Sequence, residues 1–397
     1  MPKPWGIAVV FVAACGGSDN HDAVDAATSV DASPDAPGPF EAPHGTAPQV
    51  VSLGGPVLAT PKVVPIFFTG DSTMQAQVEA FLGMLPGSPY WNATTSEYGV
   101  GDVTIGTSIV TTDTAPTTDT ALESWLAANL DGTHAGWTYD PNAIYSVYLP
   151  AGVVLQTQFG TSCQAFGAYH SETSNAAGKI TYALMPRCGN SLGLLTGASS
   201  HELIEAVTDP LPFTAGAFQD MDPEHAIWGL TPGAEVGDMC EYVATAHMSF
   251  GGNFRVQRTW SNAAAAAGHD PCVPAPTTPY QGAAPMLVED LVVQGGEGTP
   301  VTTKGVQIAV GASKTIDVVL FSDAATADFM VHATDASVLS GGASELTFTW
   351  DKTGGHNGDT LHLTITRKTA NQDGSEFVVA VGPPGMSTSL WWGFVGN

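Results

Sequence analysis

The chain has 397 residues, with 11 lysines and arginines against 38 aspartates and glutamates, which gives a formal net charge of −27. That length is enough for two folded domains, and 45 glycines and 28 prolines favour loops and short strands over long helices. So few basic residues cannot form a stripe that neutralises a phosphate backbone, which excludes nucleic acid as a partner.

The amino terminus is typical of an exported bacterial lipoprotein. Lys3 precedes an apolar run over 5–12, which is too short to span a bilayer but suits a secretory signal. Small residues then lead to Cys15, as in a lipobox. We predict a signal peptide over 1–14, a lipid on Cys15 as the only membrane contact, and a place at the outer membrane or cell surface. An ordinary cleaved signal is the alternative.

A segment over 15–47 follows that is rich in Asp, Ala, Pro and Ser and poor in large apolar side chains. Such a segment buries too little surface to offset its chain entropy, so we predict a disordered tether.

Strands and helices then alternate, which predicts an α/β (α+β) domain over 48–275. Compact apolar and β-branched runs predict strands over 62–68, 100–110 and 143–149. Apolar residues at helical spacing predict helices over 73–85, 119–130 and 193–207. The second helix has Asp119 or Thr120 as its expected cap.

The carboxy-terminal part, over 280–397, begins after a cluster of prolines. Short strand-like runs recur there between Gly, Asp and Asn turns: GVQIAV, TIDVVLF, ELTFTW, TLHLTIT and EFVVAVG. This pattern predicts an all-β immunoglobulin-like sandwich that serves as a spacer or adhesive module.

Four cysteines remain beyond Cys15, and an even number in an exported chain predicts two disulfides. Three pairings are open. We favour Cys163 with Cys188 and Cys240 with Cys272, because each pair lies within one local region. A four-cysteine zinc site is the rival, although no Cys-x-x-Cys spacing is present.

The sharpest motif is His-Glu-Leu-Ile-Glu at 201–205, inside the third predicted helix. His201 and Glu205 are one turn apart, so their side chains point into one space while the apolar neighbours face the core. Glu202 stands about 100° round the helix, where it can reach a metal-bound water without ligating the metal. This is the arrangement of the His-Glu-x-x-His metalloprotease helix, with Glu in place of the second His. We predict His201 and Glu205 as ligands and Glu202 as the catalytic base.

A tetrahedral site needs a third protein ligand. Downstream, Glu235 is followed by Asp238. This order resembles that of thermolysin-like zinc enzymes, in which an Asp beyond the ligating Glu orients a His, so the resemblance implies Glu235 as ligand and Asp238 as its support. Asp209 competes for the third position. Zinc is the expected ion, and the oxygen-rich ligand set also suits Mn²⁺ or Ca²⁺. His170 could approach the helix as a hydrogen-bond donor to a substrate or transition state, but we favour a structural role for it.

The order of these features resembles the phosphate-induced, or Exordium, protein family over about residues 48–275. The resemblance rests on the KVVPIFFTG strand, the His-Glu-Leu-x-Glu helix running into Thr-Asp-Pro, and the block Glu-Val-Gly-Asp-Met-Cys at 235–240. It implies export and the family fold. Plant members are extracellular and linked to growth, so the resemblance supports fold and export more firmly than hydrolysis.

Together these features predict an exported, lipid-anchored, monomeric metal-dependent hydrolase of the metallopeptidase kind, with a zincin-like domain and a peptide or cell-surface substrate. The alternative is a non-catalytic cell-surface binding or signalling module on the same fold.

Overall fold

The computed structural model describes residues 44–189, 191–230, 233–294, 300–339, 341–369 and 374–396. The predicted signal peptide, Cys15 and nearly all of the predicted tether therefore lie outside the described residues. The described part is mixed α/β with more strand than helix, which confirms the predicted α/β fold class. None of its helices is long and apolar enough to cross a membrane.

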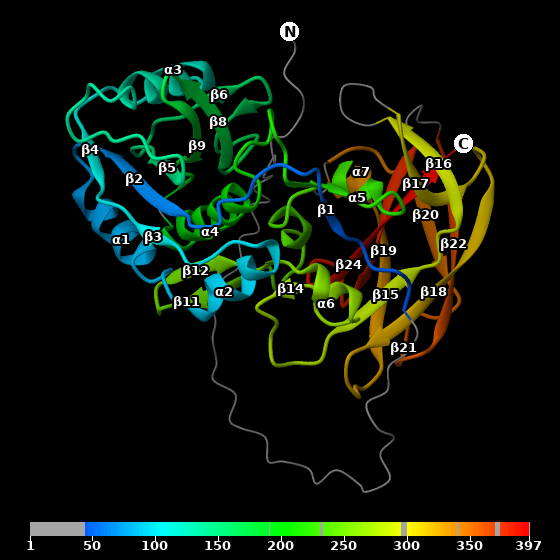
Figure 1. The fold of residues 1–397 in the computed structure, drawn as a ribbon. Coiled ribbons are helices and arrows are strands. Elements are labelled where there is room, and N and C mark those ends of the chain that lie inside the picture. Colours follow the sequence, from blue (N-terminus) through cyan, green and yellow to red (C-terminus); the bar gives the residue numbers. More distant parts are fainter. Residues whose placement is uncertain are drawn as a thin grey trace, which may run out of the picture.

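A mixed sheet forms the centre of the first half, in the strand order β3-β2-β5-β9-β8, with β4 also paired to β2 (Figure 1). Its strands are β2 (Lys62–Phe68), β3 (Thr104–Ile105), β4 (Ile109–Thr111), β5 (Ala143–Tyr148), β8 (Tyr169–Asn175) and β9 (Gly178–Met185). All neighbours pair in parallel except β8, which runs antiparallel to β9 at the edge.

Helices cover both faces of this sheet. In β2, Val63 and Phe67 join the core beneath α1 (Ser72–Leu82) and α4 (Leu192–Thr208), whereas Val64 and Ile66 join the core beneath α3 (Asp119–Asn129). Successive side chains of a strand point to opposite faces, so a strand buried along its length indicates a three-layer arrangement.

Helix α4 lies deep in the protein. The Ser191 side chain caps it by accepting a hydrogen bond from the Leu194 amide, and it ends at Thr208, just before the Asp209–Pro210 step. Every residue from Ser199 to Thr208 is buried. A helix buried on all sides must satisfy its polar side chains within the protein.

Three predicted details differ in the structure. The cap of α3 is Thr118, whose extended backbone lets its hydroxyl accept from the Ala121 amide, and neither Asp119 nor Thr120 has this role. The strand predicted over 100–110 is two short strands, because the chain leaves β2 at Gly106 and rejoins it at β4. Helix α1 ends at Leu82 rather than at 85, with Gly83 as its C-cap.

Shorter elements complete this half and surround α4. They are β1 (Val50–Ser52), α2 (Pro89–Thr95), η1 (Ser96–Tyr98), β6 (Gln156–Thr157), β7 (Gly160–Thr161), β10 (Phe218–Met221), α5 (Ala226–Leu230), η2 (Asp238–Cys240), β11 (His247–Phe250), β12 (Phe254–Gln257), β13 (Thr259–Trp260), α6 (Asn262–Ala266) and β14 (Cys272–Val273). The β11–β12 hairpin packs against α4 on the side away from the sheet (Figure 1).

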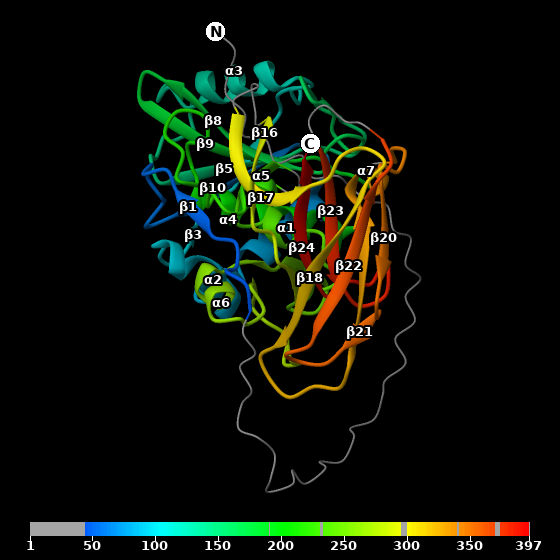
Figure 2. The same cartoon turned by 90° about the vertical axis from the view of Figure 1, so that its right-hand side faces the viewer.

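The carboxy-terminal part, from Gln281 onward, consists almost entirely of two sheets of mainly antiparallel strands, which fits the predicted β-sandwich (Figure 2). The first sheet contains β15 (Gln281–Pro285), β18 (Ser313–Ser322), β22 (Thr360–Arg367) and β20 (Leu346–Trp350). The second contains β16 (Glu289–Gln294), β17 (Pro300–Gln307), β24 (Ser389–Gly396), β23 (Ser375–Val381), β19 (Phe329–Asp335) and β21 (Gly354–Gly355), and α7 (Ala336–Leu339) follows β19.

Aromatic side chains join the two halves. Trp228 of α5 packs edge-on against Trp391 of β24 and against Trp260 of β13, with ring centroids 6.1 and 5.7 Å apart. Edge-to-face packing of this kind stabilises beyond the area it buries. One hydrophobic core therefore continues from the helical half into the sheets.

Both favoured disulfides are confirmed. Cys163 is bonded to Cys188, and Cys240 is bonded to Cys272. With all four cysteines used in pairs, the rival four-cysteine zinc site is excluded.

Candidate metal centre

Three parts of the chain bring titratable side chains together around α4. The helix supplies His201, Glu202 and Glu205, and Asp209 is its C-cap. The edge strand β8 supplies His170, the segment before η2 supplies Glu235, and η2 begins with Asp238. None of these seven residues is more than 6% exposed. We call this set the buried cluster.

The alternation of β8 directs His170 toward α4. Its neighbour Tyr169 packs in the core beneath α3, on the opposite face of the sheet. His170 Nε2 lies 3.2 Å from the backbone carbonyl oxygen of Asp209. A carbonyl can only accept, so Nε2 carries the hydrogen, and in the neutral ring the lone pair of Nδ1 faces the cluster. Histidines that bind metals are oriented by this kind of bond from their other nitrogen.

His170 Nδ1 faces three carboxylates at nearly equal distances. It lies 3.5 Å from Glu202 Oε2, 3.6 Å from Glu205 Oε2 and 3.6 Å from Glu235 Oε2. These separations are too long for hydrogen bonds, and Nδ1 has no hydrogen-bond partner in the described chain. Two ligands that each lie about 2.1 Å from zinc at the tetrahedral angle are about 3.4 Å apart. The spacing is thus that of ligands around a common cation.

His201 faces a different set of atoms. Its Nε2 lies 3.1 Å from Glu205 Oε2 and 3.7 Å from Asp238 Oδ1. The ligand atoms of the cluster therefore form two groups in which all members lie within 4.8 Å of one another: His170, Glu205 and Glu235, and His201, Glu205 and Asp238. The predicted ligands His201 and Glu235 lie in different groups, which share Glu205. Glu202 and Asp209 belong to neither group.

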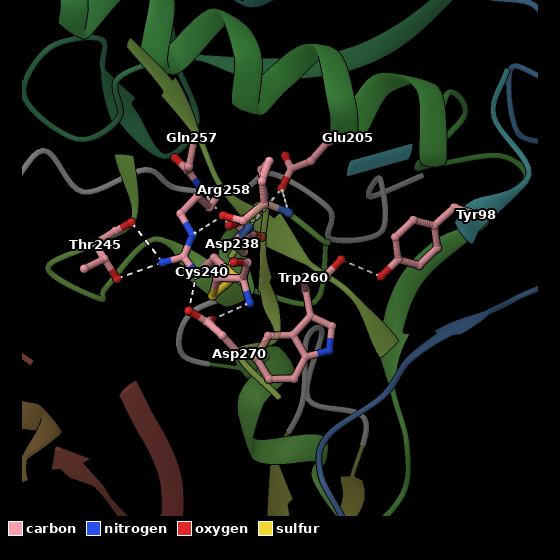
Figure 3. Close-up of a disulfide and its surroundings, with 12 residues drawn as sticks. Tyr98, Glu205, Asp238, Cys240, Thr245, Gln257, Arg258, Trp260 and Asp270 are labelled. Atoms are coloured by element: carbon pink, nitrogen blue, oxygen red, sulfur yellow. Dashed lines mark hydrogen bonds and ion pairs between the residues drawn. A yellow bond between two sulfur atoms is a disulfide. The ribbon is translucent and has the colours of Figure 1, made fainter. Parts of the chain in front are cut away.

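Glu205 is held in place by backbone amides. The amides of Gly237 and Asp238 each donate to its Oε1 at 3.2 Å, which leaves Oε2 directed at the two imidazoles. Figure 3 shows Glu205 below the helix, above the loop that carries Asp238. A side chain at Gly237 would clash with these groups, since its Cβ would lie 2.7 Å from Glu205 Oε1 and 2.9 Å from the His201 ring.

Contacts from β12 and β13 fix the loop that carries Glu235 and Asp238. The Gln257 side chain donates to the Gly237 carbonyl at 2.8 Å, and the Trp260 amide donates to the Val236 carbonyl at 2.7 Å. The Cys240–Cys272 disulfide ties the end of this loop to β14 (Figure 3).

Arg258 reinforces the same region from the other side. Its buried guanidinium pairs with Asp270 and donates to the carbonyls of Cys272, Pro274 and Thr245 (Figure 3). The candidate ligands thus rest on covalent and charge-assisted supports rather than on a free loop.

Burial dominates the electrostatics of the cluster. It raises the pKa of Glu202, Glu235 and Asp238 above their usual range, because an ionised carboxylate loses its hydration there. For Glu205 burial acts in the same direction, but interactions with protonated His201 and His170 outweigh it and hold its pKa well below the ordinary value in the cation-free chain. Burial acts to lower the pKa of both histidines, but the neighbouring carboxylates outweigh it and in turn raise that pKa. Glu205 is therefore the carboxylate of the cluster that ionises at the lowest pH.

The donor set fits a divalent cation. Buried atoms without a hydrogen-bond partner in the described chain include His170 Nδ1, both nitrogens of His201, both oxygens of Glu202, and one oxygen each of Glu205, Asp209 and Glu235. Each such atom costs desolvation energy unless something binds it. Imidazole nitrogen with carboxylate oxygen is a ligand set that zinc and manganese accept.

Sequence reasoning left His170 outside the predicted ligands, and the structure brings it to the centre of the cluster. No local motif marks it, because it reaches α4 only through the pairing of β8 with β9. Asp209, the predicted rival for the third position, uses Oδ1 to accept from the Ala217 amide at 2.7 Å.

No protein-family model matches this chain, and no curated protein and no solved structure is significantly similar to it. The function must therefore be argued from the buried cluster alone.

Proposed function

We propose that the buried cluster binds a divalent cation, zinc in the first instance, with His170, Glu205 and Glu235 as ligands. The observation that carries this proposal is His170 Nδ1, a buried ring nitrogen oriented by a backbone carbonyl and placed 3.5–3.6 Å from three carboxylate oxygens. A proton on Nδ1 would draw one carboxylate to about 2.8 Å, whereas a cation keeps its ligands apart.

We further propose that the chain is a metal-dependent hydrolase of the metallopeptidase kind, with a peptide or cell-surface substrate. Such a cation supplies Lewis-acid chemistry, in that it polarises a carbonyl and makes water more acidic. Glu202 would take the proton of the attacking water on its Oε2, which faces the same space as the proposed ligands without belonging to either ligand group. The zincin-like fold and the relation to Exordium proteins belong to this proposal, as does export on a lipid anchor, which the two disulfides support.

A non-catalytic role is the second candidate, and one observation favours it. The proposed ligands are almost completely enclosed, with Glu235 the most exposed at 6%. Closed sites are typical of structural metals, whereas catalytic metals keep an open position. The cation would then stabilise a cell-surface binding or signalling module.

Two measurements on the full chain, purified without added metal or chelator, test these proposals. Elemental analysis should find bound divalent metal that is lost in His170→Ala but kept in Glu202→Gln. Absence of metal from the native chain, or equal metal in native chain and His170→Ala, would refute the cation site.

Peptide hydrolysis then separates the two candidate functions. The hydrolase proposal expects cleavage by the native chain, none by Glu202→Gln, and equal metal in both. A metal-loaded chain that cleaves nothing from a broad peptide library, or a fully active Glu202→Gln variant, would count against the hydrolase and leave the enclosed structural site as the better account.

A further inference from the structure

We infer that the centre holds two divalent cations, with Glu205 Oε2 as the ligand common to both. This inference rests on the proposed function, which needs only the cation at His170, Glu205 and Glu235. The second position would be formed by His201 Nε2, Glu205 Oε2 and Asp238 Oδ1, whose mutual separations fall within 4.8 Å.

The first argument is the placement of His201. Its Nε2 lies 3.1 Å from Glu205 and 3.7 Å from Asp238, values that bracket the spacing of about 3.4 Å expected around a tetrahedral cation. Neither ring nitrogen has a hydrogen-bond partner in the described chain, although the side chain is only 2% exposed. A buried imidazole without a hydrogen bond is costly, and a cation at Nε2 removes part of that cost.

The second argument is the geometry of Glu205. Two backbone amides fix its Oε1, so the carboxylate cannot turn away from the cluster. Its Oε2 is directed at both imidazoles, 3.6 Å from His170 Nδ1 and 3.1 Å from His201 Nε2. One oxygen thus faces two nitrogen ligands on two sides, which is the arrangement of a bridging ligand.

The third argument is charge. Five carboxylates of the cluster, those of Glu202, Glu205, Asp209, Glu235 and Asp238, are at most 6% exposed. Within the described residues four of the five pair with histidines, Asp209 makes no ion pair, and none pairs with a lysine or an arginine. One divalent cation offsets two of these charges and a second offsets two more, so a pair of cations suits the cluster better than one.

The pair would be first-row divalent ions such as Zn²⁺ or Mn²⁺, because each position offers one imidazole and two carboxylates. Two cations held a few ångströms apart by shared carboxylates recur in hydrolases, where they act on both the attacking and the leaving oxygen. The assignment adds His201 and Asp238 to the ligands and leaves Glu202 as the free carboxylate.

The test counts metal ions in the full chain. We expect the native chain, freed of metal and titrated with Zn²⁺, to bind two equivalents, measured by calorimetry and elemental analysis. Asp238→Asn should bind one equivalent, and so should Glu235→Gln. Glu241→Gln is the matched control: this carboxylate also has a buried, unpartnered oxygen but belongs to neither ligand group, so two equivalents should remain.

A second readout does not depend on stoichiometry alone. Two Mn²⁺ ions that share Glu205 should give a spin-coupled electron paramagnetic resonance spectrum, and Glu205→Gln should abolish the coupling. Near-ultraviolet circular dichroism shows which variants are folded. If Asp238→Asn does not fold, His201→Gln removes a ligand from the same position.

The outcomes separate the two proposals. No bound zinc overturns the proposed function and this inference together. One equivalent in the native chain overturns this inference and leaves the single-cation site standing. Two equivalents that persist in both Asp238→Asn and Glu235→Gln place the ions elsewhere and overturn both assignments.

Discussion

Gly237 gives the most direct test of how the loop positions Glu205. Its φ of −75° and ψ of −46° are open to alanine, so the change Gly237→Ala adds no backbone strain. The new Cβ would lie 2.7 Å from Glu205 Oε1 and 2.9 Å from Cε1 and Nδ1 of His201. Real Cβ contacts are longer than this, so either the carboxylate or the loop must move.

Either movement breaks the two hydrogen bonds that the backbone amides donate to Glu205 Oε1. Overpacking of this kind costs about 1–3 kcal/mol of folding free energy. If a similar amount is lost from cation binding, affinity falls by about tenfold for each 1.4 kcal/mol. We expect Gly237→Ala to unfold at lower temperature than the native chain and to bind zinc about 5- to 140-fold more weakly.

Thermal unfolding and zinc titration measure the two effects. Gly45→Ala is the matched control, because its added Cβ would have its nearest neighbours at 3.7 and 3.9 Å, an ordinary contact. A Gly237→Ala variant with the affinity and unfolding temperature of the native chain would refute the idea that this loop positions Glu205.

Three further changes have defined outcomes. Arg258→Met should destabilise the chain by about 3–5 kcal/mol in denaturant unfolding, because it leaves Asp270 buried without its ion pair; a loss below about 1 kcal/mol would contradict this. Burial, helped by the charges of Arg255 and His201, lowers the pKa of His247 from 6.5 to about 4. The unfolded chain therefore binds more protons in that interval, so stability should fall as pH drops from about 6.5 to about 4, and His247→Phe should show a shallower fall. Replacing Cys240 and Cys272 by serine frees a loop with a sequence separation of 32 and should cost about 3–4 kcal/mol, an expectation that unchanged unfolding would refute.

The position of α4, and the contact between its His and Glu side chains, could be predicted from the sequence. The apolar spacing and the Asp209–Pro210 step predict a helix over 193–207, and the structure has it over Leu192–Thr208. The spacing of His201 and Glu205 predicts that their side chains meet, and their atoms approach to 3.1 Å. Periodicity and termination act within a few residues, so a single sequence displays them.

The residues that other elements place beside that helix could be predicted only in part. Glu235 and Asp238 were predicted beside it, but their assignment to different imidazoles depends on the turn at Gly237. His170 depends on an edge strand that pairs antiparallel with β9, a contact fixed by tertiary structure. Sequence patterns carry the period of a strand but not its neighbours, so a ligand from a distant strand leaves no local signal.

The position of the buried cluster links cation binding to folding. Helix α4 is buried on all sides, and His201, Glu202 and Glu205 cannot reach solvent without its displacement from β12 and the sheet. Without a cation, the chain must protonate several carboxylates or leave charges uncompensated in a dry core, and both lower the free energy of unfolding at neutral pH. A cation that binds the folded chain and not the unfolded one reverses this cost. The proposed ligands of the cation are therefore also residues on which the packing of the domain depends.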